Sequence, residues 1–163
     1  MALLIRGASQ CLICHHIIQI GDEVISFAPF IPNELDPLYL FHDANFHQDC
    51  FLNHPLADMA MKRYEEITER TRHEARIDAI TKVLITDPDD YFTLGHLTDD
   101  VTNPLYPYNY LHLRRSMLSS WPDLEKVYAL IKALEASGKW KGNALKWIAD
   151  VLEKALHSRD MTA

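Results

Sequence analysis

The clearest periodic pattern of apolar residues lies in the last 45 residues of the chain. A glycine at position 138 is typical of the residue that follows a helix, and a second periodic stretch begins near Asn143. Their short connection predicts an antiparallel helical hairpin. In the first stretch, apolar residues recur at steps of three and four, as on one buried helix face: Leu124, Val127, Tyr128, Ile131 and Leu134.

A third helical pattern follows Pro55, which suits a first helical turn. Strong helix formers continue to about Arg76, and the pattern predicts a helix from Leu56 onward. Its apolar positions again mark one face: Leu56, Met59, Ala60, Tyr64 and Ile67.

Upstream of Pro55 the pattern favours short strands and turns. Residues 17–28 predict two β segments around a turn at Gly21-Asp22, and residues 38–46 predict another strand pair. Residues 87–113 are rich in Pro, Asp and Tyr without clean periodicity, which predicts an ordered but irregular segment. We expect no internal repeat. The sequence therefore predicts an α+β fold, with a β-rich module over residues 1–55 and a helical domain over residues 56–163.

The first module contains all three cysteines, in a spacing that suits a metal. Cys11 and Cys14 would place two thiolates on one tight turn, and His47 and Cys50 would lie one helical turn apart. An odd number of cysteines, two of them only three positions apart, disfavours a disulfide framework. Two such pairs are typical of a tetrahedral zinc site, and four protein ligands leave no position for water or substrate. We therefore expect one structural Zn²⁺.

Other histidines near this motif are alternative candidates. His15 and His16 directly follow the first pair and could replace a zinc ligand. His42 and Asp43 are adjacent, so on a strand they would point to opposite faces, which disfavours a catalytic dyad. Either of them alone could instead hydrogen-bond to a zinc ligand from outside the coordination sphere.

The motif resembles a known type of finger. CLIC, the I-x-x-GD-E turn and FHQDCF, with the fourth ligand entering a helix, look like the poly(ADP-ribose) polymerase type finger, and LIM half-modules are similar with a shorter loop. The resemblance covers about residues 1–60. It implies a treble-clef-like arrangement, a zinc-stapled pair of hairpins followed by a helix.

The charge pattern argues against carrying over the DNA binding of that family. Residues 1–61 contain Arg6 as their only Lys or Arg, and residues 83–113 contain none. Nucleic-acid affinity depends on Lys and Arg that neutralise phosphates. Two acidic stretches instead favour a basic protein partner, with electrostatic steering of the encounter. The carboxylates expected to meet it are Asp22, Glu23, Glu34, Asp36, Asp89, Asp90, Asp99 and Asp100.

These features favour a non-catalytic binding protein. The sequence has no Gly-rich phosphate loop, nucleophile elbow or His-Glu-x-x-His motif. Stretches such as LGHLTDD and SGKWKGNALKWI are similar to small bacterial proteins found beside polymorphic toxins, which implies an immunity protein or antitoxin that neutralises a basic toxin such as a nuclease. We expect a cytoplasmic location and no membrane association. The alternative is a nucleic-acid-associated regulator that makes its contacts through Arg70, Arg72, Arg76, Arg114 and Arg115.

Overall fold

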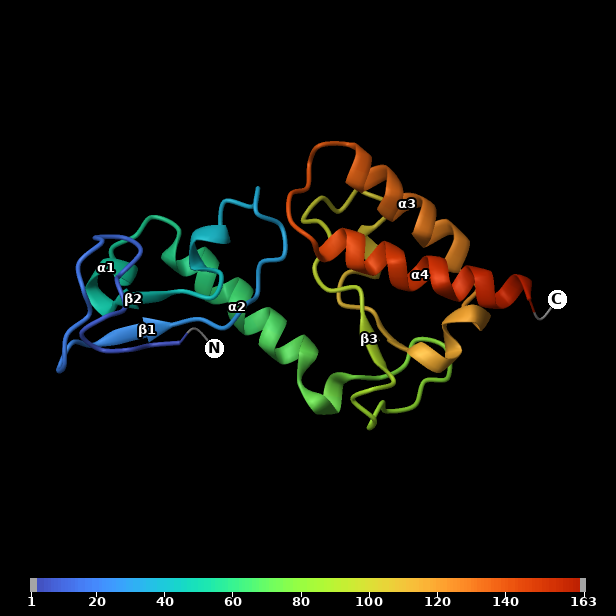
Figure 1. Ribbon diagram of the computed structural model, residues 1–163, viewed down its shortest axis with the longest axis horizontal. Coiled ribbons are helices and arrows are strands. Elements are labelled where there is room, and N and C mark those ends of the chain that lie inside the picture. The colour runs from blue at the N-terminus through green and yellow to red at the C-terminus, as the bar shows by residue number, and fades with distance from the viewer. Residues whose placement is uncertain (1–2, 162–163) are drawn as a thin grey trace. The chain divides into compact units, whose positions relative to one another are not determined.

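The computed structural model describes residues 3–161 and divides the chain into two compact units. Unit 1 spans Met1–Thr68 and unit 2 spans Glu69–Ala163. Each unit combines helices with one two-stranded antiparallel sheet, so the prediction of mixed α and β structure is confirmed (Figure 1). Within the described part of the chain, no helix is both long enough and apolar enough to cross a membrane.

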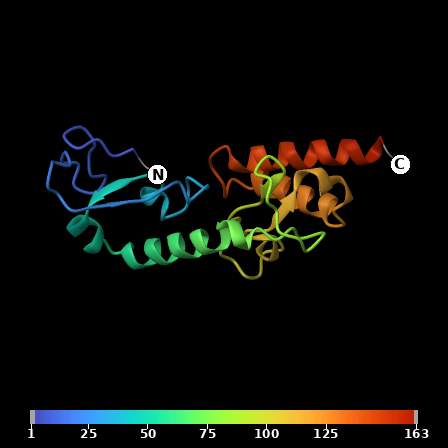
Figure 2. The same ribbon diagram turned by 90° about the horizontal axis from the view of Figure 1, so that it is seen from below.

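Unit 1 begins with a tight turn that is closed by a β-bridge between Gln10 and Ile17. Strand β1 (Val24–Ser26) then pairs with β2 (Asn45–His47), and the two arrows lie side by side in Figure 1. A loop with the 3₁₀ helix η1 (Tyr39–Phe41) connects them. The short helix α1 (Gln48–Leu52) follows β2 directly, and the longer α2 (Ala57–Thr71) is continuous in Figure 2.

Aromatic rings dominate the core of unit 1. Phe27 lies at its centre, with ring centroids 5.0–6.3 Å from five other aromatic side chains. Ala57 and Ala60 of α2 are buried in the same core, and Tyr64 and Ile67 pack against it. Because these residues of α2 belong to the core of unit 1, that unit extends to Thr68, beyond the predicted boundary at residue 55.

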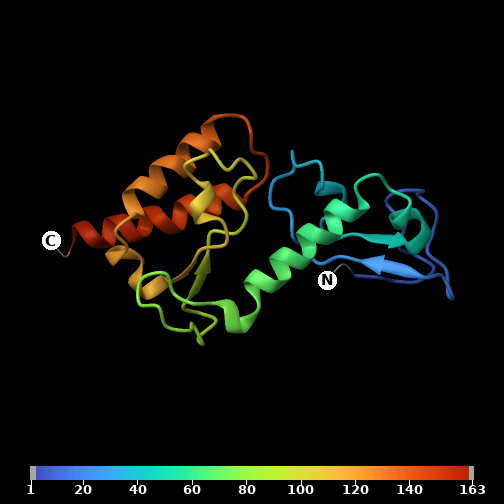
Figure 3. The same cartoon turned by 180° about the vertical axis from the view of Figure 1, so that it is seen from behind.

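Unit 2 has the same types of element. The 3₁₀ helix η2 (His73–Ala75) comes first, and strand β3 (Tyr91–Thr93) pairs with β4 (His112–Arg114). The 3₁₀ helices η3 (Tyr106–Tyr108) and η4 (Arg115–Ser120) flank β4. The last two helices of the unit are α3 (Leu124–Ala136) and α4 (Ala144–Asp160). They pack against each other and are the orange and red helices of Figure 3.

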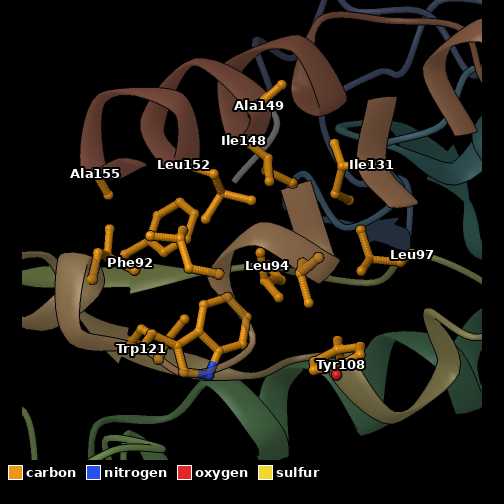
Figure 4. Close-up of a cluster of buried hydrophobic side chains, with 14 of the residues drawn as sticks. Phe92, Leu94, Leu97, Tyr108, Trp121, Ile131, Ile148, Ala149, Leu152 and Ala155 are labelled. Carbon is orange, nitrogen blue, oxygen red and sulfur yellow. The ribbon is translucent and has the colours of Figure 1, made fainter. Parts of the chain in front are cut away.

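Helices α3 and α4 close the core of unit 2 over the sheet. The Tyr128 hydroxyl donates to Glu153, and Arg159 pairs with Glu125 at 3.0 Å, so the start of α3 lies beside the end of α4. Figure 4 shows Ile148 and Leu152 pointing toward the strand residue Phe92 and its neighbours. Buried side chains from five positions of α4 enter this core: Leu145, Ile148, Ala149, Leu152 and Ala155.

The two units repeat one local architecture, contrary to the expectation of no internal repeat. Val24 pairs with His47 in unit 1, and Tyr91 pairs with Arg114 in unit 2, so equivalent residues are 67 positions apart. The Gln10–Ile17 bridge recurs with the same spacing as the bridge between Ile77 and Leu84. Core positions keep their apolar character but seldom their identity, which hides the repeat in the sequence.

Unusual backbone conformations recur at the same spacing. His15 and Lys82 both have φ near +60°, and Asp43 and Tyr110 have φ of 49° and 58°. Left-handed conformations are uncommon outside glycine, so their recurrence is not a general property of loops. The side chains that hydrogen-bond to the loop between the two strands also correspond in the two units. The His42 side chain accepts hydrogen bonds from two successive backbone N–H groups 12 and 11 residues earlier, and Asn109 does the same.

Several predicted strands differ from those observed. Residues 17–28 do not form the predicted hairpin, because the strand within them pairs with β2 instead. Residues 38–46 contain η1 and the start of β2 rather than a strand pair. The segment 87–113, predicted to be irregular, contains β3, η3 and the start of β4. Strands of three residues are too short to show an alternating pattern.

Candidate metal centre

The first two cysteines lie on the tight turn at the start of unit 1. The Cys11 carbonyl accepts a hydrogen bond from the His15 N–H at 2.8 Å, and the Cys11 N–H donates to the His16 carbonyl at 3.0 Å. The left-handed conformation of His15 turns the chain back between these bonds. Cys11 is completely buried, and Cys14 is half-buried.

The second pair lies where β2 passes into α1. His47 is the last residue of β2 and Cys50 lies in the first turn of α1, which follows without a loop. The Gln48 N–H donates to the Glu23 carbonyl at 2.9 Å and fixes this junction to the residue before β1. The local fold thus brings a strand end, a helix start and the N-terminal turn together.

Cys11, Cys14, His47 and Cys50 lie close enough to bind one metal ion, as the sequence predicted. Their four ligand atoms all lie within 4.8 Å of one another. The His47 Nδ1 atom faces the sulfurs, at 3.3 Å from the Cys14 Sγ and 3.9 Å from the Cys50 Sγ. Neither His15 nor His16 belongs to this group.

The pKa values of Cys11 and Cys50 are shifted in opposite directions. Burial acts to raise the pKa of Cys11, but hydrogen bonds from the backbone N–H groups of Cys14, Ile13 and His47 outweigh it and lower the pKa to about 6. Burial and the neighbouring sulfurs of Cys14 and Cys11 raise the pKa of Cys50 to about 11. A divalent cation would remove this mutual repulsion, since it favours the thiolate at every ligand. The donor set therefore fits a metal.

Asp22 contacts His47 on the side of the ring opposite the sulfurs. Its carboxylate lies 3.2 Å from the His47 Nε2 atom and also accepts the Gln19 N–H at 2.6 Å. Arg6 fixes the same loop by donating to the carbonyls of Gln19 and Asp22. A carboxylate on the far nitrogen fixes the tautomer and orientation of a ligating histidine.

This contact corrects the expectation that His42 or Asp43 supports a ligand. His42 instead accepts the N–H groups of Phe30 and Ile31, and burial lowers the pKa of its imidazole. Asp43 is exposed in a left-handed turn. The sequence had placed Asp22 in a turn and among the carboxylates expected to bind a partner, and its contact with His47 was not predicted.

A cavity of about 490 Å³ opens beside the sulfur cluster. Cys14, His47 and Cys50 are among the residues that line it. Three acidic residues line it as well: Asp22, Glu23 and Asp49.

The eight carboxylates predicted to bind a partner divide equally between the units. Asp90 is used internally, because it accepts the N–H and hydroxyl of Ser116 at 2.8 and 3.1 Å. Asp99 pairs with His96 at 3.3 Å, and Asp36 and Asp100 each accept a backbone N–H two residues later. Glu34 is half-buried. Exposed residues of the set are Glu23, Asp89, Asp99 and Asp100.

The five arginines of the nucleic-acid alternative all make contacts within unit 2. Arg70 and Arg76 lie over tyrosine rings, and Arg115 lies over the rings of two aromatic side chains. Arg72 pairs with Glu69, and Arg114 donates to a backbone carbonyl. This arrangement favours structural roles for these side chains.

Comparisons with known proteins bring no further constraint. No family model, curated protein or solved structure matches the chain.

Proposed function

We propose that unit 1 is a treble-clef-like zinc finger that holds one structural Zn²⁺ through Cys11, Cys14, His47 and Cys50. Three sulfurs and one imidazole nitrogen are the ligands that closed, four-coordinate zinc sites prefer. The support of His47 by Asp22 has the form found at zinc-bound histidines. The metal would stabilise the fold, and the chain would have no catalytic function.

We further propose that the chain binds a basic protein partner. The observation that carries this proposal is the cavity lined by Asp22, Glu23 and Asp49 beside the sulfur cluster. Three thiolates, a neutral imidazole and Zn²⁺ would carry a net charge of −1 there, which adds to the three carboxylates. A positively charged lysine or arginine side chain of a partner would therefore enter a site of opposite, negative charge.

An immunity protein or antitoxin is the role that fits these properties best. Nuclease active sites that bind phosphates carry cationic surfaces, and an acidic inhibitor meets such a surface quickly through electrostatic steering. The net charge of −7 and the absence of Lys or Arg from residues 83–113 support the same role.

The metal part is tested on the purified chain by elemental analysis. We expect one zinc per chain, and Cys14→Ser should abolish it. A protein that carries no stoichiometric metal, with thiols that titrate freely under native conditions, would exclude the zinc finger.

The partner part is tested by quantitative affinity purification from the native host. Glu23→Lys and Asp49→Lys reverse the charge at the cavity, whereas Asp150→Lys makes the same change on the exposed face of α4. We expect the two cavity variants to lose one specific basic protein that the wild type and Asp150→Lys retain. All variants should keep one zinc per chain.

The recovered protein then separates an inhibitor from a general adaptor. Expressed alone in the host, it should stop growth, and co-expression of the wild-type chain should restore growth. Recovery of an acidic partner or of nucleic acid would refute the proposal, as would equal recovery by the cavity variants.

A further inference from the structure

We propose that unit 2 is a second copy of the finger in which a hydrogen-bonded carboxylate cluster replaces the metal. Each of the four proposed zinc ligands of unit 1 has an equivalent residue 67 positions later in unit 2. None of these equivalent residues is a cysteine or a histidine. Cys11, Cys14, His47 and Cys50 correspond, in this order, to Asp78, Thr81, Arg114 and Met117.

Asp78 is the centre of this cluster. It is one of three buried polar residues among those described, and its relative exposure is 0%. One carboxylate oxygen accepts the N–H and the hydroxyl of Thr81, both at 2.7 Å, and the other accepts the Arg114 N–H at 2.9 Å. A buried carboxylate is costly unless it is paired and hydrogen-bonded, and these bonds satisfy Asp78.

The same two backbone donors serve both units. In unit 1 the N–H groups of Cys14 and His47 donate to the Cys11 sulfur, and in unit 2 those of Thr81 and Arg114 donate to Asp78. The backbone therefore forms one anion-binding corner twice. It receives a thiolate in unit 1 and a carboxylate in unit 2.

Arg114 supplies the positive charge that a metal would otherwise provide. It replaces His47, and its guanidinium lies 3.8 Å from Asp90 and donates to the Leu84 carbonyl at 3.1 Å. The same charge also lowers the pKa of the Asp78 carboxyl, whereas in unit 1 three thiolates need a divalent ion. The replacement is thus consistent in charge as well as in geometry.

A larger apolar core explains why unit 2 can fold without a metal. Its core contains 16 buried residues, against 12 in unit 1, and α4 contributes five of them. The repeated architecture ends with α3, which corresponds to α2, so α4 is an addition. Small domains with limited cores need a metal or a disulfide, and a larger core removes that need.

Restoring the four ligands in the full-length chain tests the proposal. The variant D78C/T81C/R114H/M117C should bind two zinc ions per chain, and Co²⁺ should show twice the wild-type tetrahedral thiolate absorption. A control, A79C/K82C/R115H/S116C, carries the same residue types at neighbouring positions and should bind one. A folded test variant that binds one ion would overturn the proposal.

Asp78→Asn gives an answer even if the fourfold variant fails to fold. It places an NH₂ group against donors that need an acceptor, so we expect amide exchange at Thr81 and Arg114 to rise about 10- to 100-fold. Asp89→Asn, at an exposed position, should leave it unchanged. Unaltered exchange in Asp78→Asn would overturn the proposal. Both variants should keep one zinc.

Discussion

Asp22 connects the acidic cavity with the sulfur cluster. Its carboxylate orients the His47 ring, and a backbone carbonyl of the same residue is held by Arg6. The only Lys or Arg among residues 1–61 is thus used to order an acidic loop. Asp22 therefore acts as a positioning residue for the proposed zinc site.

Asp22→Asn should weaken zinc binding without removing a ligand. Loss of such a carboxylate typically reduces metal affinity about 10- to 100-fold, since the imidazole becomes less basic and less well oriented. Competition with a chromophoric chelator measures this change. Glu23→Gln removes a neighbouring exposed charge and is the matched control, with wild-type affinity expected. Equal affinities of the two variants would contradict the role of Asp22.

The Asp78 carboxyl should make unit 2 sensitive to acid. Burial acts to raise its pKa, but hydrogen bonds from Thr81 and Arg114 and the Arg114 charge hold the pKa below its usual range. The unfolded carboxyl titrates near pH 3.9, so its stabilisation is fully present above about pH 5 and is lost as pH falls through the folded-state pKa.

Urea unfolding of unit 2, followed by NMR signals of β3 and β4 between pH 6 and pH 3, measures this loss. The midpoint should fall on acidification in the wild type and in Asp89→Asn. In Asp78→Asn it should be lower at pH 6 and fall less steeply. If the urea midpoint of Asp78→Asn fell with pH as steeply as that of the wild type, a group other than Asp78 would be responsible.

At the scale of elements, α4 determines how large the core of unit 2 becomes. Leu152 is completely buried in it, and the half-exposed Trp147 packs against Phe92 with ring centroids 5.4 Å apart. The helix thus covers apolar surface that the repeated architecture alone would leave exposed.

Leu152→Ala should destabilise unit 2 by about 3 kcal/mol, because it removes buried methyl groups and leaves a cavity. Val83→Ala changes a residue with 54% relative exposure in the same unit and should cost far less. Urea unfolding read by the signals of unit 2 compares the two. Metal content should stay constant, and equal effects of both changes would be inconsistent with a core role for α4.

The sequence predicted the helices better than the strands. Helices α2, α3 and α4 extend over at least 13 residues each, so three- and four-residue spacings are visible. Each strand has three residues and is defined by its partner, which lies about 20 residues away. Turn residues such as Asp43 and Tyr110 carry no glycine signal although their φ is positive.

The cluster of Cys11, Cys14, His47 and Cys50 could be predicted because the residue types and their spacing are specific. The residue that hydrogen-bonds to His47 from outside the cluster could not. Asp22 reaches His47 across 25 residues, and no local pattern encodes that contact. The repeat was hidden for a related reason. Its most diagnostic positions differ in unit 2, where Asp78 and Arg114 replace a cysteine and a histidine.

At the scale of the whole molecule, two units with one architecture use different means of stabilisation. Unit 1 has the smaller core and a four-residue cluster that fits a metal. Unit 2 has the larger core and a buried carboxylate with its own donors. We therefore expect the two units to respond differently to removal of zinc.

Chelation under reducing conditions should unfold unit 1 and spare unit 2. For closed zinc sites the binding energy is largely folding energy, so amides of β2 should lose protection. The equivalent amides of β4 serve as the internal control and should remain protected. Hydrogen exchange with mass spectrometry resolves the two peptides. Equal loss in β2 and β4 would show that unit 2 also depends on the metal.

The cavity beside Cys14 and Cys50 also admits small oxidants. All three cysteines belong to unit 1, and two of them line this cavity. Peroxide would convert thiolates there to sulfenic acid or a disulfide, which no longer hold zinc. Oxidative stress would therefore inactivate the proposed zinc site beside the acidic cavity, while its counterpart around Asp78 and Thr81, which contains no thiol, would persist.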